Sequence, residues 1–226
     1  MPRNALLTFA LVLGAAITAL IALAVVGDRS QAFTLGVRAD AAVVKLKPRD
    51  EVCQRPIEVL ESFDHLRLQL GTYGRPGLPY SVEVRPAGAG RPLAGASVSG
   101  GYADSSLQSV RLSREVPTGR EVAVCIRNRA RQPVAVYGSS DLSNRSSTSY
   151  LNGRQTGADL TIVFEFSDSK STAELLPAIV RRAALFHGGW ASPAAYWVMF
   201  ALILVALATL PALALRSALE RAPNRE

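Results

Sequence analysis

The chain has 226 residues, of which 49% are hydrophobic and 19% charged, and its formal net charge is +7. The hydrophobic residues concentrate at the two ends, which indicates membrane-spanning segments rather than an unusually large soluble core. The basic residues stand singly or in pairs such as Arg181-Arg182, without a Lys/Arg-rich run among aromatics, so we expect no nucleic-acid partner. An acidic polymer or an anionic lipid surface stays as an alternative partner.

The first predicted element lies within residues 1–27. Residues 5–26 contain no charged side chain, and a helix needs about 20 such residues to cross a bilayer. We therefore expect an N-terminal transmembrane helix or signal anchor. A cleaved signal peptide is the alternative, because small residues at Ser30 and Ala32 form a cleavage-like site.

Residues 28–170 are predicted to form an extracytoplasmic domain, in which apolar residues alternate with polar ones. This period of two is typical of half-buried strands, and Gly, Pro, Asn and Ser clusters separate the runs. The pattern predicts a mainly β domain, an antiparallel β-sandwich of jelly-roll-like type. The predicted strands are residues 43–47, 56–60, 66–70, 80–84, 96–100, 109–113, 122–126, 133–137 and 160–166.

The only two cysteines, Cys53 and Cys125, lie inside this domain. An even pair in an exported domain predicts a disulfide bond, and two buried free thiols are the alternative. No Trp lies between them, so the pattern is not that of an immunoglobulin domain.

Residues 171–190 predict a juxtamembrane amphipathic helix. Ser171 and Glu174 fit a capping box, and apolar residues follow at helical spacing. Pro177 lies too far inside for a first-turn proline, so it bends the helix or marks a later start. The helix lies either at the bilayer surface or against the sandwich.

Residues 191–215 lack charge and predict a C-terminal transmembrane helix. Trp190, Tyr196 and Trp197 are expected at the membrane interface, where amphipathic rings prefer to lie. A basic cytoplasmic tail, residues 216–226, follows. The basic flanks predict a two-pass protein of the cell membrane with both termini in the cytoplasm and the middle domain outside.

The sequence contains no arrangement of residues that specifies catalysis, a metal site or a cofactor. Its two histidines, His65 and His187, have no partner at metal-ligand spacing. Residues 95–100 resemble a nucleophile elbow but lack its fifth-position glycine and its strand-to-helix context. We therefore expect a non-enzymatic protein without cofactor or metal.

Four loops display aromatic residues beside polar ones, which is the combination that sugar-binding sites use. The alternative is that these tyrosines close the sandwich ends and bond to backbone carbonyl groups. The candidate ligand-binding residues are Tyr73, Arg75, Tyr102, Asp104, Tyr137 and Asn152.

The chain resembles uncharacterised actinobacterial-type membrane proteins that carry a β-sandwich between two transmembrane helices. The stretches that carry the resemblance are residues 68–73, 100–102, 124–128, 133–138 and 182–186. The resemblance covers most of the chain and implies the two-helix layout, but it implies no activity and no site residue.

Three functions are compatible with these expectations. The first is a membrane-anchored envelope protein whose sandwich binds a surface glycan or an envelope partner. The second is an accessory subunit of a membrane complex that makes or exports envelope polymers, with the helices as the interface to a membrane protein. The third is an envelope hydrolase that uses scattered carboxylates.

Overall fold

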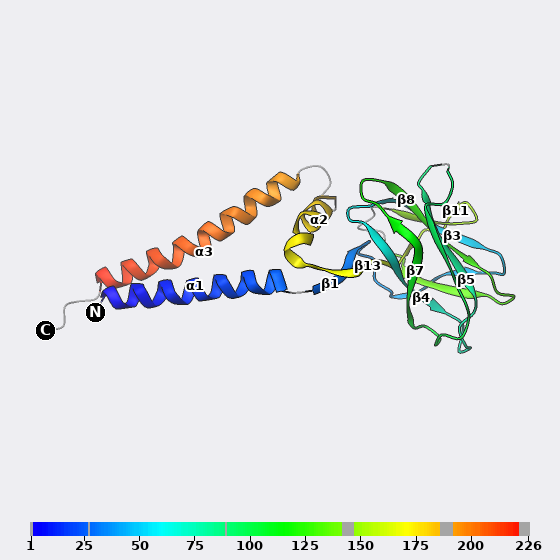
Figure 1. Ribbon diagram of the computed structural model, residues 1–226, viewed down its shortest axis with the longest axis horizontal. Coiled ribbons are helices and arrows are strands. Elements are labelled where there is room, and N and C mark those ends of the chain that lie inside the picture. Colours follow the sequence, from blue (N-terminus) through cyan, green and yellow to red (C-terminus); the bar gives the residue numbers. More distant parts are fainter. Residues whose placement is uncertain (1, 27, 89, 142–146, 186–191, 222–226) are drawn as a thin grey trace. The chain divides into compact units, whose positions relative to one another are not determined.

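The computed structural model describes residues 2–26, 28–88, 90–141, 147–185 and 192–221 (Figure 1). The chain divides into two compact units. One, the helical unit, contains residues 1–28 and 170–226, and the other, the β domain, contains residues 29–169.

The helical unit consists of α1 (Pro2–Val26), α2 (Thr172–Leu185) and α3 (Pro193–Arg221). The predicted capping box begins α2: the Glu174 N–H donates to Ser171 Oγ at 3.2 Å, and the Ser171 N–H donates to Glu174 Oε2 at 2.9 Å. Pro177 lies inside α2, so the helix continues through it.

Within the described residues, one helical stretch, Pro193–Ala214 of α3, is long and apolar enough to cross a membrane, judged by length and composition. The corresponding stretch of α1 is shorter, Leu11–Leu20. Two spans were expected, and this finding supports the C-terminal one. Tyr196 and Trp197, two of the expected interface residues, lie within the first two turns of α3, whereas Trp190 lies outside the described residues.

Two antiparallel sheets make up the β domain, which confirms the expected β-sandwich architecture. Every strand pairing whose register is defined is antiparallel. The six-stranded sheet has the order β11 (Arg154–Gln155), β10 (Thr148–Leu151), β3 (Glu51–Glu58), β8 (Glu121–Asn128), β5 (Tyr80–Pro86), β6 (Ala94–Val98). The seven-stranded sheet contains β1 (Asp28–Thr34), β13 (Ile162–Ser171), β4 (Phe63–Gly71), β9 (Val134–Ser139) and β12 (Asp159–Leu160), with β2 (Ala41–Leu46) beside β9 and β7 (Leu107–Val116) beside β4.

Eight consecutive strands, β2 to β9, contribute four strands to each sheet. Their spatial orders are β2-β9-β4-β7 and β3-β8-β5-β6. Most connections therefore cross from one sheet to the other, which gathers the loops at the ends of the sandwich. In the seven-stranded sheet, β4 pairs with β13 and β7 along its first part and with β9 at Leu70 and Gly71, so the sheet curls.

The core follows the period-two pattern of the sequence. Leu66, Leu68 and Leu70 of β4 are at most 1% exposed, and the alternate residues Val124 and Ile126 of β8 are fully buried. Each such side chain contributes about 1.5–3 kcal/mol to folding by leaving water.

An aromatic cluster fills one part of the core. The Phe164 ring stacks on Phe33 at 4.2 Å between centroids and meets Phe63 edge-on at 4.8 Å. The three rings come from β13, β1 and β4, and each is less than 7% exposed.

A buried glutamine links the two sheets. Gln54 of β3 is fully buried; its Nε2 donates to Ser147 Oγ at 2.8 Å and to Asp159 Oδ1 at 3.0 Å. The Leu160 N–H of β12 donates to Gln54 Oε1 at 3.0 Å. The amide is thereby satisfied at both ends, as a buried polar group must be.

Cys53 and Cys125 form the predicted disulfide, across a sequence separation of 72. The two residues are directly opposite each other in the β3–β8 ladder. The bond therefore ties neighbouring strands of one sheet rather than one sheet to the other.

Candidate functional site

The predicted loop site brings Asp104 against the loop that follows β4. The N–H groups of Thr72 and Gly74 donate to the two Asp104 carboxylate oxygens at 2.5 and 2.6 Å. These two backbone hydrogen bonds hold the pKa of Asp104 below its ordinary value, so the carboxylate is ionised. Asp104 therefore holds the loop backbone, and this carboxylate is already engaged.

Arg75 and Tyr102 also serve the loop structure. Arg75 Nε donates to the Thr72 carbonyl at 2.8 Å, and its guanidinium contacts the Gln132 side-chain oxygen. The Tyr102 hydroxyl donates to the Leu78 carbonyl at 3.0 Å, as expected of a tyrosine that closes a sandwich end.

The remaining predicted residues differ in exposure and place. Tyr73 is 54% exposed at the loop surface, whereas the Tyr137 hydroxyl is hydrogen-bonded to Ser105 Oγ at 3.0 Å. Asn152 lies apart from both, in the turn between β10 and β11, where its Oδ1 accepts from the Glu51 N–H at 3.0 Å. The structure brings Tyr73, Arg75, Asp104 and Tyr137 to one loop region and leaves Asn152 elsewhere.

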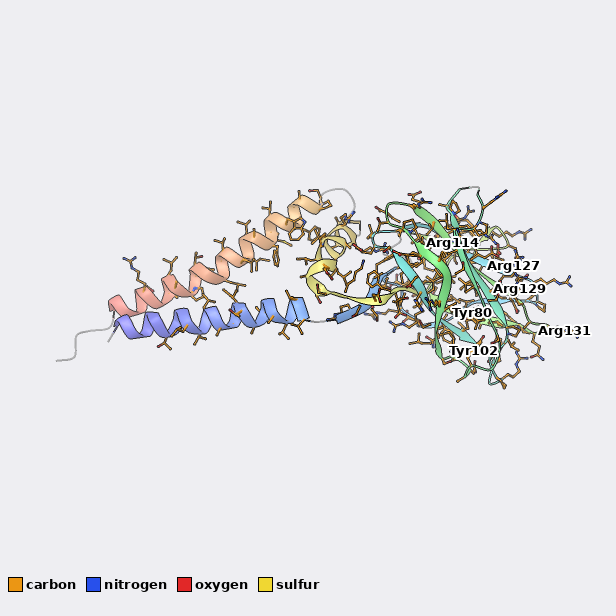
Figure 2. The ribbon with its side chains drawn as sticks, viewed as in Figure 1. Tyr80, Tyr102, Arg114, Arg127, Arg129 and Arg131 are labelled. Atoms are coloured by element: carbon orange, nitrogen blue, oxygen red, sulfur yellow. A yellow bond between two sulfur atoms is a disulfide. The ribbon has the colours of Figure 1, made fainter. Side chains whose placement is uncertain are left out.

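A second surface is strongly basic. Arg49, Arg127, Arg129 and Arg131, which we call the arginine patch, line one open depression at the end of β8. Figure 2 labels three of them, Arg127, Arg129 and Arg131, on the β domain. Among the described residues, no carboxylate forms an ion pair with Arg49, Arg129 or Arg131.

Asn128 holds the arginine patch together. It is 1% exposed, and its Nδ2 donates to the carbonyls of Leu46, Lys47 and Gln132 at 2.8–3.2 Å. The Arg49 N–H donates to the Asn128 carbonyl at 3.2 Å. One buried amide thus fixes the β2–β3 turn against the loop after β8, and this places Arg49 beside the other three arginines.

The backbone of the β2–β3 turn is strained at the patch. Arg49 has a φ of 69°, a left-handed conformation that is uncommon for a residue with a Cβ. Such strain persists where the surroundings over-determine it, and it gathers at functional sites.

The arginine patch adjoins two further depressions on the six-stranded sheet. Arg49 and Arg127 also line a depression above the disulfide with Arg55 and Arg85, and Arg129 lines another with Arg114. The acidic residues that line these three depressions are Glu51 and Glu83.

Glu51 is the centre of an ion-pair network at this surface. Arg85 binds both its carboxylate oxygens, each at 2.9 Å, and Arg127 donates to Oε2 at 2.9 and 3.1 Å. Burial alone would raise the pKa of Glu51, but the hydrogen bonds and charges of Arg85 and Arg127 outweigh it and lower the pKa.

Two arrangements resemble catalytic or metal sites without their geometry. Asp64 binds His65 Nδ1 at 2.9 Å and also accepts from the Ser167 hydroxyl. In a hydrolytic triad the histidine stands between serine and carboxylate, whereas here the carboxylate stands between them. Within the described residues, three potential metal ligands meet at Glu51, Cys53 and Cys125, and the disulfide engages both sulfurs.

No protein family matches the chain, and no curated protein matches it. The resemblance to actinobacterial-type membrane proteins therefore stays a prediction.

Proposed function

We propose that this chain is a non-enzymatic, membrane-anchored protein of the cell envelope whose β domain binds an anionic surface glycan through the arginine patch. The observation that carries the proposal is the positive charge of the three arginines in the patch that form no ion pair with any carboxylate of the described residues. Like charges gathered in one depression repel, and this repulsion opposes folding unless an anion joins them. Guanidinium groups bind carboxylates and phosphates in a forked geometry, so an acidic polymer is the ligand that relieves the repulsion.

The strand order supports a binding module. Four strands ordered β2-β9-β4-β7 facing four ordered β3-β8-β5-β6 correspond to a jelly roll, and lectin domains use that architecture. This likeness is one of architecture alone, so the ligand is argued from the arginine patch.

In this proposal the β domain lies outside the cytoplasm, and both termini of the chain lie in the cytoplasm. A disulfide indicates an oxidising compartment, and Pro193–Ala214 supplies one membrane span. Residues 5–26, which lack charge, supply the second span in the two-pass arrangement.

This arrangement predicts opposite labelling at two exposed serines. In cells that produce the full chain without its native cysteines, Ser140→Cys in the β domain should react with a membrane-impermeant maleimide. Ser217→Cys near the end of α3 should react only after lysis. Protection of position 140 in intact cells, or labelling of position 217, contradicts the two-pass arrangement.

Neutralising the arginine patch should weaken polymer binding. We expect the triple variant Arg49→Gln, Arg129→Gln and Arg131→Gln to lose at least about ten-fold in affinity for fluorescent polygalacturonate, since each lost charge contact is worth about 0.5–1 kcal/mol. The measurement is fluorescence anisotropy of the full chain in nonionic detergent at low ionic strength, where surface charges are least screened.

A control variant that loses three other arginines tests whether the binding depends on the arginine patch or only on the net positive charge of the protein. Arg38, Arg111 and Arg120 are exposed, and they line neither the arginine patch nor the two depressions that adjoin it. Their replacement by Gln should change the affinity less than two-fold. Equal losses in both triple variants would show non-specific attraction, and binding to anionic lipid vesicles but not to the polymer would show a membrane-surface site instead.

A further inference from the structure

The Glu51 carboxylate binds Arg85 and Arg127 in the way that the carboxylate of a bound ligand would. Its carboxylate accepts four hydrogen bonds, two from Arg85 to separate oxygens and two from Arg127. The Arg85 contacts have the bidentate, fork-to-fork geometry in which a guanidinium binds a carboxylate. Glu51 is directly opposite Arg127 in the β3–β8 ladder, so the ladder itself sets this contact.

Arg127 belongs to two surfaces at once. It lines the arginine patch with Arg129 and Arg131, and it lines the depression above the disulfide with Arg85. Glu51 accepts from Nε and an Nη atom of Arg127, so this edge of the guanidinium cannot bind an external anion at the same time. Arg85 is engaged further, because Glu83 accepts from its Nε at 2.9 Å.

We propose that Glu51 is a built-in competitor for the ligand, and that the ligand's anionic groups are carboxylates, as in a glycan of uronic acid units. This inference rests on the proposed function. A uronate carboxylate that reaches the depression would take the place of the Glu51 carboxylate on Arg127 and Arg85, while neighbouring units contact the arginine patch. The internal carboxylate keeps the affinity for each unit low, so tight binding requires a polymer that engages several sites together.

Removing the competing charge should strengthen binding. Glu51→Gln keeps the size of the side chain and removes its charge, and we expect about a five-fold gain in affinity for polygalacturonate. Glu58→Gln, an exposed residue of the same strand, changes the net charge equally and should alter the affinity less than two-fold. The gain should vanish when Arg127→Gln is combined with Glu51→Gln, because the released guanidinium is then absent.

The measurement is fluorescence anisotropy of the full-length variants, with inorganic polyphosphate as the second probe. If Glu51→Gln does not fold, Glu51→Asp, which draws the carboxylate back by one methylene, should give a smaller gain. Unchanged or weaker polygalacturonate binding by a folded Glu51 variant overturns the competitor role, because Glu51 would then orient the arginines. An equal or larger gain for polyphosphate overturns the carboxylate assignment. Neither result changes the loss expected from the arginine-patch variant, which tests the proposed function separately.

Discussion

Replacing Phe164 with alanine is expected to lower the free energy of unfolding by about 3–5 kcal/mol, because it leaves a cavity where two other rings lose their partner. Phe164 is fully buried and contacts both Phe33 and Phe63, so three strands of the seven-stranded sheet depend on it. Urea unfolding of the full chain in nonionic detergent, followed by near-ultraviolet circular dichroism, measures the change.

Two further variants test whether the loss comes from the cavity. Phe164→Leu keeps most of the volume and should cost only about 1 kcal/mol. Tyr73→Ala removes an aromatic ring that is 54% exposed and should change stability by no more than about 0.5 kcal/mol. Similar losses in the Phe164→Ala and Tyr73→Ala variants would contradict the role of the aromatic cluster.

Removal of the disulfide is the second change with a large expected effect. Replacing Cys53 and Cys125 with alanine frees a loop of about 70 residues in the unfolded chain, and the chain-entropy relation predicts a loss of about 4 kcal/mol. For a domain of this size the melting temperature should fall by more than about 10 °C. Differential scanning calorimetry in nonionic detergent measures the shift.

Reduction of the native protein provides the control. Full reduction should lower its melting temperature to nearly that of the alanine variant, and the variant itself should not respond to reductant. A native protein whose melting temperature is the same with and without the bond would show that the β3–β8 ladder alone holds these strands.

Much of the fold could be predicted from the sequence because the core uses simple alternation. Leu66, Leu68 and Leu70 alternate with polar residues, and they lie on the buried face of β4 as predicted. The β3 strand was placed too late, at residues 56–60, because Pro56 and Ile57 masked the earlier alternation of Glu51 to Arg55. The β1 strand was missed because no alternation marks it.

One missed element had a recognisable signal. Asn152-Gly153 has the positive φ angles of 48° and 83° that a tight hairpin turn requires, and it joins β10 to β11. We expected only a loop there, since β10 is four residues long and carries little hydrophobic pattern. The order of the strands could not be predicted, because it depends on contacts between distant parts of the chain that no local sequence pattern reveals.

The basic surface was underestimated for a related reason. Arg127, Arg129 and Arg131 recur at every second residue where β8 ends, but no long basic run marks them. Arg49 joins them only through the hydrogen bonds of Asn128, a contact across about 80 residues. The predicted loop site stays a prediction, but its hydrogen bonds could not be read from local patterns. Asp104 accepts from the N–H groups of Thr72 and Gly74 in another loop, and Arg75 binds the Thr72 carbonyl of its own loop.

The neighbouring positions of β1 and β13 have a consequence for biosynthesis. The two strands are hydrogen-bonded to each other, yet Ile162 follows Thr34 by 128 residues (Figure 1). At a translation rate of about 5–20 residues per second, the first strand emerges on the order of ten seconds before its neighbour. During that interval the backbone groups of β1 lack their partner strand. This sheet edge can therefore be completed only after nearly all of the β domain has been made.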